Sequence, residues 1–143
     1  MQVKIINQSS NALPAYESLE ASGLDLRAHI PEPITLQPLQ RTLVPTGLSI
    51  ALSKGFEVQI RPRSGLAYRH GITVLNSPST IDADYRGEIK MLLINLGDQP
   101  FEIKNGDRVA QLVVSRVEHI QWLCVDKLGE TARGQGGFGS TGI

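Results

Sequence analysis

Turn-forming residues interrupt this 143-residue chain at short intervals, and their spacing limits the regular structure that the chain can form. Prolines and glycines recur between residues 14 and 106, and the runs between them are short. The runs 56–60 (FEVQI), 89–95 (IKMLLIN) and 108–117 (RVAQLVVSRV) have the alternating or continuously apolar composition that is typical of strands. Many short strands between turns indicate an all-β sandwich, jelly roll or barrel with a single core.

Two segments carry a more specific local signal. The segment 64–71 (SGLAYRHG) favours one short helix, with Ser64 as a candidate N-cap and Gly71 as its stop signal. The segment 80–90 (TIDADYRGEIK) places a charge at every second position from Asp82 to Lys90, which is the period of a strand. A solvated strand face with cross-strand ion pairs is the simplest explanation of that pattern.

The overall charge and the cysteine count exclude several function classes. Fourteen lysines and arginines balance fourteen aspartates and glutamates, so the whole chain has no electrostatic attraction for nucleic acid or for an anionic membrane. The single cysteine, Cys124, cannot form an internal disulfide, and no zinc-like cluster of cysteine and histidine accompanies it. No run reaches the roughly 18 apolar residues that a membrane span needs. We therefore expect a cytoplasmic protein without a nucleic-acid or membrane partner.

Three stretches contain candidate binding residues. Arg63, Ser64 and the amide of Gly65 stand at the predicted start of the helix and could bind phosphate, although two solvated arginines before a capped helix would look the same. Asp25 lies between two leucines, so it either pairs with a cation or faces solvent. Gln111 lies within an apolar strand and needs hydrogen-bond partners from the backbone or from a ligand.

The last segment, 129–143 (GETARGQGGFGSTGI), is rich in glycine and differs from the rest of the chain. A glycine-rich terminus is usually a disordered tail, because fixing it costs much conformational entropy. Uncovered backbone amides, an arginine and one aromatic ring would also suit an arm that closes on a phosphorylated aromatic ligand. Both interpretations are open at this point.

Five stretches, in their order along the chain, resemble the five motifs of the trimeric dUTPase family. They are ASGLDLRA (21–28), RPRSGLA (61–67), VLNSPSTIDADYRGE (74–88), GDRVAQLV (106–113) and RGQGGFGSTG (133–142). The resemblance implies a distorted β-barrel or jelly roll that forms a homotrimer. It also implies a domain over residues 1–128 and a flexible arm over 129–143 that closes a neighbouring subunit's active site. One subunit supplies the third motif, a neighbour supplies the first, second and fourth, and the third subunit supplies the arm.

The implied reaction is the hydrolysis of dUTP to dUMP and pyrophosphate, with water attacking the α-phosphorus. This reaction keeps uracil out of DNA and supplies dUMP for dTMP synthesis. By similarity, Asp82 is the general base that takes the proton of the water, and it also accepts a hydrogen bond from the 3'-OH of the sugar. A carboxylate held within hydrogen-bond reach is suited to this task because water is a weak nucleophile.

The resemblance assigns the remaining substrate contacts residue by residue. Asn76 would bind the uracil edge together with backbone groups of Thr80 and Ile81, Tyr85 would exclude a 2'-OH, and Lys90 would contribute at the far side of the hairpin.

The phosphates would be held by Arg63, Ser64 and Gly65. Asp25 and Gln111 would reach Mg²⁺ or a phosphate through water, as outer-sphere ligands, because magnesium keeps most of its waters. In the arm, Phe138 would stack on uracil, and the γ-phosphate would be held by Arg133, Gly139, Ser140 and Thr141.

Two alternatives remain at the level of sequence. A dCTP deaminase, or a bifunctional dCTP deaminase and dUTPase, resembles this chain around the hairpin, but it carries a catalytic glutamate where this chain has Leu92 and lacks such an arm. A non-catalytic trimer that binds nucleotide is the other alternative, and an intact Asp82, Arg63 and Phe138 count against it.

Overall fold

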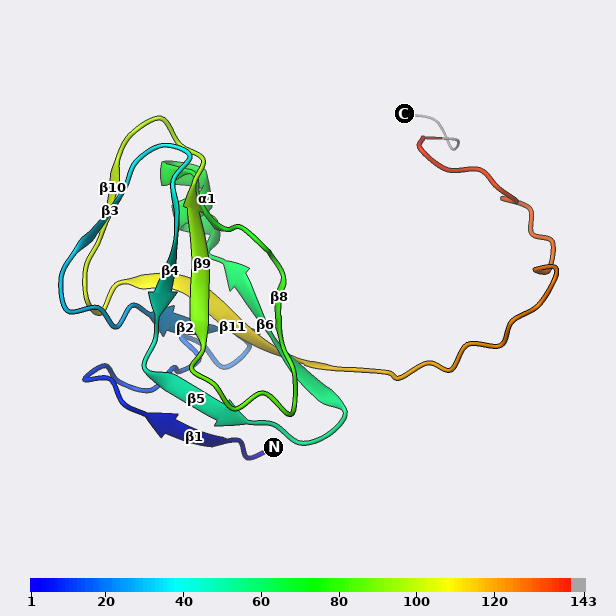
Figure 1. Ribbon diagram of the computed structural model, residues 1–143, viewed down its shortest axis with the longest axis horizontal. Coiled ribbons are helices and arrows are strands. Elements are labelled where there is room, and N and C mark those ends of the chain that lie inside the picture. The colour runs from blue at the N-terminus through cyan, green and yellow to red at the C-terminus, as the bar shows by residue number, and fades with distance from the viewer. Residues whose placement is uncertain (140–143) are drawn as a thin grey trace.

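The structure is a computed structural model, and it describes residues 1–139. Figure 1 shows a body of short strands with one short helix, and a C-terminal segment that runs away from it. The elements are β1 (Lys4–Asn7), β2 (Leu24–Arg27), β3 (Ile34–Leu36), β4 (Arg41–Pro45), β5 (Leu48–Ala51), β6 (Phe56–Pro62), α1 (Ser64–His70), β7 (Ile72–Val74), β8 (Ser79–Ile81), β9 (Lys90–Asn95), β10 (Phe101–Ile103) and β11 (Arg108–Arg116). The predicted all-β class and the single short helix are confirmed.

The strands pair in four antiparallel sheets. The largest has the order β2-β11-β6-β8, the second has the order β4-β9-β7, and two further pairs are β1-β5 and β10-β3. Along the described chain these ladders do not join into a closed barrel, so the fold is an open, layered form of the predicted architecture. The four-stranded sheet matters most here because it carries the candidate site residues of three motifs.

The core lies between the sheets and is built from alternating strand residues. On β6, Val58 and Ile60 are fully buried, whereas Arg61 is exposed. Met91 and Leu93 of β9 are also fully buried. Each such side chain contributes about 1.5–3 kcal/mol on burial, so the alternation fixes which face of each strand points outward.

The helix begins differently from the prediction and ends as predicted. Arg63, not Ser64, occupies the N-cap position, and its side chain makes no capping hydrogen bond. Arg63 keeps extended backbone angles that continue β6, and its guanidinium is used elsewhere, so Ser64 becomes the first helical residue. Gly71 ends the helix in the left-handed conformation, φ 67°, which glycine adopts without steric cost.

The predicted strand over 80–90 is wrong from Asp82 to Ile89, between β8 and β9. β8 ends at Ile81, and the Tyr85 N–H then donates to the Asp82 carbonyl at 3.1 Å, which closes a turn. The Arg86 guanidinium donates to two carbonyls of the same loop, and the Glu88 carboxylate accepts from the Gly47 N–H at 2.8 Å. The alternating charges therefore include anchors of a loop and do not mark one solvated strand face.

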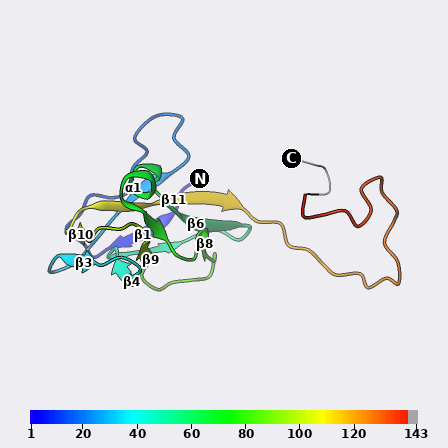
Figure 2. The same ribbon diagram turned by 90° about the horizontal axis from the view of Figure 1, so that it is seen from above.

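The chain leaves the body after β11. Residues 117–139 contain no helix or strand, and most of their side chains are exposed. Figures 1 and 2 show this segment as a long trace that extends away from the sheets in both views. Within residues 1–139, no helix has the length and the apolar character that a membrane crossing requires.

Candidate active site

The predicted phosphate and metal residues lie together around one cavity of about 300 Å³. Its walls come from β2, from the junction of β6 with α1, from β11 and from the loop before β2. The residues that line it are Asp25, Arg63, Ser64, Gly65 and Gln111, together with Glu17, Leu66 and Arg69. We call this cavity the anion pocket.

Strand register explains why these residues meet. Gln111 on β11 is the partner of Asp25 on β2 and of Arg61 on β6. Partners on adjacent strands project from the same face, so Asp25 and Gln111 lie side by side. The Gln111 amide donates to the Pro62 carbonyl at 2.9 Å, so the half-buried glutamine uses the backbone as a partner.

Asp25 pairs with cations and does not face open solvent. Its side chain is 15% exposed, and its Oδ1 lies 2.9 Å from Arg63 Nε. Its Oδ2 lies 3.1 Å from Arg108 Nη1, and the same nitrogen lies 3.0 Å from Glu17 Oε1. Sequence reasoning missed Arg108 and Glu17, although Arg108 belongs to a stretch, GDRVAQLV, that had already been singled out.

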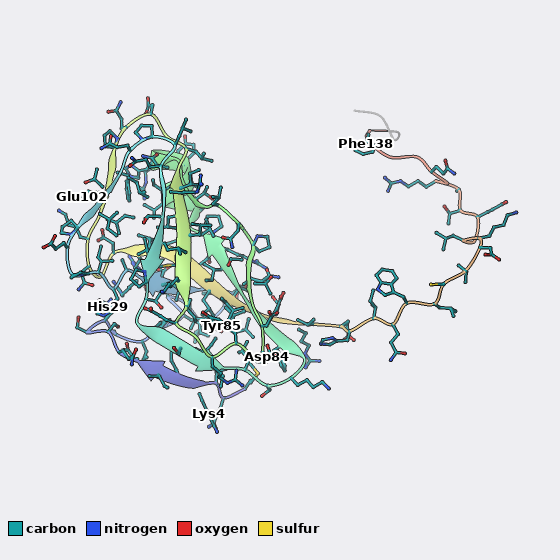
Figure 3. All side chains as sticks on the ribbon, viewed as in Figure 1. Lys4, His29, Asp84, Tyr85, Glu102 and Phe138 are labelled. Carbon is teal, nitrogen blue, oxygen red and sulfur yellow. The ribbon has the colours of Figure 1, made fainter. Side chains whose placement is uncertain are left out.

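Asp82 lies in a different part of the molecule. It is exposed on the loop after β8 and lines a separate cavity of about 630 Å³. The charged neighbours in that cavity are Lys54, Glu57, Asp84 and Arg86, and His119 also lines it. Figure 3 shows Asp84 and Tyr85 of the same loop in the lower part of the body, whereas Figure 1 shows α1 near the top in the same view.

The residues that the sequence predicts to bind the nucleoside lie on or next to this loop. Thr80 and Ile81 belong to β8, opposite Gln59 and Val58 of β6. The Tyr85 hydroxyl donates to the Glu88 carbonyl at 3.1 Å, which fixes the ring on the loop.

The other two predicted contact residues, Asn76 and Lys90, lie outside this loop. Asn76 follows β7 and Lys90 starts β9, and both are exposed. The structure thus gathers Thr80, Ile81, Asp82 and Tyr85 along β8 and the loop after it, apart from the anion pocket.

The length of β6 separates the two regions within one chain. Ile81 pairs with Val58, so Asp82 begins its loop beside Glu57, whereas Arg63 follows the other end of β6. The six residue steps from Glu57 to Arg63 correspond to about 20 Å at a rise of about 3.3 Å per residue. One chain therefore does not place Asp82 and Arg63 around the same phosphate group.

Comparisons with known proteins agree with the five motifs. The family model described as dUTPase matches residues 9–142. A deoxyuridine 5'-triphosphate nucleotidohydrolase of Cytophaga hutchinsonii is 61% identical over 140 residues, which is 98% of this chain and 91% of that protein. The enzyme of the same name from Finegoldia magna is 52% identical and covers 99% of both chains. The chain belongs to the dUTPase family.

Solved structures of dUTPases share the fold. A dUTPase of Staphylococcus bacteriophage 80alpha, a mutant in complex with dUpNHpp, superposes with a TM-score of 0.89 over 99% of each chain. Its sequence is 19% identical, so this likeness concerns the fold alone.

Membership of the dUTPase family supports a requirement for a divalent metal ion. Within residues 1–139, no group of three or more His, Cys, Asp or Glu side chains could hold such an ion directly. Asp25 retains free lone pairs beside its two arginines, since each carboxylate oxygen has two, and Gln111 keeps its amide oxygen. This donor set fits a hydrated ion that binds substrate phosphates and touches the dUTPase through water.

Residues 129–139, the described part of the predicted arm, line neither of these two cavities of their own chain. Figure 3 shows Phe138 far from the body, and the ring is fully exposed. The Arg133 guanidinium donates to the Gly136 carbonyl at 2.8 Å, within the segment itself. Gly139 adopts φ 89° beside Phe138, and the predicted contacts Ser140 and Thr141 lie outside the described residues.

Proposed function

We propose that this dUTPase-family chain hydrolyses dUTP to dUMP and pyrophosphate in a homotrimer with three shared active sites. In each site, one subunit supplies β8 and the loop with Asp82, a neighbour supplies the anion pocket, and the third supplies its arm, residues 129–143. The observation that carries this proposal is the distance of about 20 Å along β6 between the two halves in one chain. A closed ring of three subunits brings unlike surfaces together at each interface, as this arrangement requires.

The chemical step is a single displacement. The Asp82 carboxylate accepts a proton from one water molecule while the oxygen of that water forms a bond to the α-phosphorus. The bond between the α-phosphorus and the bridging oxygen breaks, and pyrophosphate leaves with the bonding electrons. General base catalysis of this kind contributes about 10²- to 10⁴-fold, and no covalent intermediate forms.

β8 and the segments that flank it bind the deoxynucleoside. The Asn76 amide offers a donor and an acceptor to the uracil edge, and backbone groups of Thr80 and Ile81 complete the contact. Tyr85 lies against the sugar and leaves no space for a 2'-OH, and Lys90 adds a contact at the far side. The fixed Tyr85 hydroxyl supports this role, because a ring held by the Glu88 carbonyl cannot move aside easily.

The anion pocket binds the phosphates through Arg63, Ser64 and the Gly65 amide. Asp25 and Gln111 orient the waters of the metal ion, for which we propose Mg²⁺. When bound, the ion offsets negative charge on the phosphates and on the pyrophosphate leaving group.

The arm covers the site from a third subunit. We propose that Phe138 stacks on uracil, and that Arg133, Gly139, Ser140 and Thr141 bind the γ-phosphate. The exposure of the Phe138 ring in its own chain supports a role against another surface.

The cellular role follows from the reaction. Removal of dUTP keeps uracil out of DNA, and dUMP is the precursor for dTMP synthesis. We propose that this role is carried out in the cytoplasm.

A pyrophosphate-release assay over dUTP, dCTP, dTTP and UTP, with and without Mg²⁺, tests this proposal. We expect release from dUTP in the presence of Mg²⁺ and far slower release from the other three nucleotides. Ammonia release from dCTP is measured in parallel. Ammonia without pyrophosphate from dUTP would contradict the proposal and would identify a deaminase.

A further inference from the structure

Three elements of the anion pocket converge on one further residue, Arg108, at the start of β11. Its Nη1 donates to Asp25 Oδ2 at 3.1 Å and to Glu17 Oε1 at 3.0 Å. Its backbone carbonyl accepts from Arg63 Nη1 at 2.8 Å. Arg108 therefore links β2, the loop before β2 and the junction of β6 with α1.

A β-bulge aims Arg108 into this cluster. Arg108 pairs with Arg27 and Ala110 pairs with Leu26, so Val109 is an extra residue on β11. Residues 108 and 111 are three apart and would project from opposite faces of a regular strand. The extra residue in the bulge shifts the alternation of side chains by one position. Arg108 therefore lies on the same face as Gln111 and Asp25.

The consequence is that two contacts fix the Arg63 guanidinium. Its Nε lies 2.9 Å from Asp25 Oδ1, and its Nη1 donates to the Arg108 carbonyl. Among residues 1–139, its third nitrogen, Nη2, has no hydrogen-bond partner. Two contacts on a planar group define its orientation, so the remaining N–H groups keep one direction beside the anion pocket.

Asp25 can orient Arg63 only if the Asp25 carboxylate is itself fixed, and Arg108 supplies the contact that fixes it. The Asp25 side chain is 15% exposed and the Arg108 side chain is 38% exposed, so their contact is only partly screened by solvent. Glu17 is 66% exposed, and its pair with Arg108 contributes less. Two carboxylates thus alternate with two guanidinium groups, and the removal of Arg108 leaves this cluster one positive charge short.

We propose that Arg108 is a positioning residue for the phosphates, which acts by holding Asp25 and, through it, the Arg63 guanidinium in the orientation that binds the triphosphate. The inference rests on the proposed function of the anion pocket. It predicts that replacement of Arg108 lowers ligand affinity by a larger factor as the number of phosphates on the ligand increases.

The test is a binding series by calorimetry with dUMP, dUDP and dUpNHpp in the presence of Mg²⁺. For Arg108→Ala we expect dUMP affinity within about twofold of the wild type, and dUpNHpp affinity lower by about 10- to 100-fold. The kcat/KM for dUTP falls by a similar factor. Arg108→Lys recovers part of the loss, because one ammonium pairs with Asp25 but cannot reproduce the arginine geometry.

Arg27→Ala is the matched control. Arg27 is the strand partner of Arg108, and its Nη1 donates to the Gly106 carbonyl at 2.9 Å. This variant also loses an arginine contact in the same strand pair, but it leaves the contacts of Asp25 and Arg63 in place. We expect a lower Tm and no dependence of affinity on phosphate number.

Unchanged dUpNHpp affinity in Arg108→Ala, or an equal loss for all three ligands, overturns the inference. If Arg108→Ala does not fold, the same binding series is measured with Arg108→Lys and Glu17→Gln. For these variants we expect a smaller loss of affinity that still increases with phosphate number. Wild-type protein that does not hydrolyse dUTP contradicts the proposed function instead. If the wild type hydrolyses dUTP but Arg108→Ala loses the same affinity for all three ligands, only the inference about Arg108 is wrong.

Discussion

The anion pocket and the loop that carries Asp82 differ in how their charged side chains are held. In the pocket, Asp25 and Arg63 are partly buried and contact each other, and both also contact Arg108. In the loop, Asp82 is exposed, and anchoring comes from Arg86 and Glu88 through the backbone. The contacts of the pocket are complete within one chain, whereas Asp82, our proposed general base, is exposed and, in the proposed trimer, faces a second subunit.

The largest expected effect is on the loop. Asp82→Asn removes the proton acceptor and keeps nearly the same shape, so we expect kcat to fall by about 10²- to 10⁴-fold. Trimer assembly and most of the affinity for dUpNHpp should remain, because the proposed phosphate contacts lie in the anion pocket. Steady-state kinetics and calorimetry measure the two quantities separately. Turnover at the wild-type rate would refute the assignment of Asp82.

The next effect concerns the covering arm. Deletion of residues 129–143 should lower kcat/KM on the order of 10²-fold, because an open site does not hold the triphosphate and the water in reactive geometry. Sedimentation should show an unchanged trimer. Phe138→Ala is the milder version, with a loss that corresponds to about 1–3 kcal/mol of stacking. Full activity of the truncated protein would show that the arm is not part of the active site.

A smaller effect is expected in the anion pocket. In Asp25→Asn, one amide oxygen can still accept from Arg63, but the new NH₂ group then faces the Arg108 donor. We expect KM for dUTP to rise about 10-fold, with kcat less affected than in Asp82→Asn. An effect on kcat as large as that of Asp82→Asn would show that the two regions are not separate in function.

The smallest effect concerns selectivity for the sugar. A Cβ at Gly87 would lie 2.4 Å from the Tyr85 hydroxyl oxygen and 2.6 Å from Cζ, so Gly87→Ala must displace the ring. We expect the preference for dUTP over UTP to weaken by about 10-fold, in the range that a pocket achieves by shape. Paired kcat/KM values for the two nucleotides measure this. An unchanged ratio would mean that Tyr85 does not exclude the 2'-OH.

The sequence predicts the parts of this fold that depend on local pattern. Alternating burial on β6 and the left-handed Gly71 follow from periodicity and from turn chemistry. The segment after Asp82 was misread because a charge at every second position looks like a strand, whereas Arg86 and Glu88 bind backbone groups of a loop. Periodicity does not report such contacts.

In the candidate site, too, local motifs predict some residues and miss others. The five motifs indicate Asp25, Arg63 and Gln111, and the structure places them in one pocket. Arg108 was missed because strand alternation places it on the face opposite to Gln111, and only the extra residue at Val109 reverses this. A bulge depends on pairing with β2, which a single segment of sequence does not contain.

The account depends on the sharing of one site between subunits, and mixed trimers test this directly. Asp82→Asn and Arg63→Ala proteins, each expected to be inactive, are refolded together in equal amounts, and mixed trimers are confirmed by mass spectrometry. A site that needs Asp82 from one subunit and Arg63 from the next is intact with a chance of one half for each, so about a quarter of the wild-type activity should return. Mixed trimers that stay as inactive as the two parent proteins would contradict the shared site.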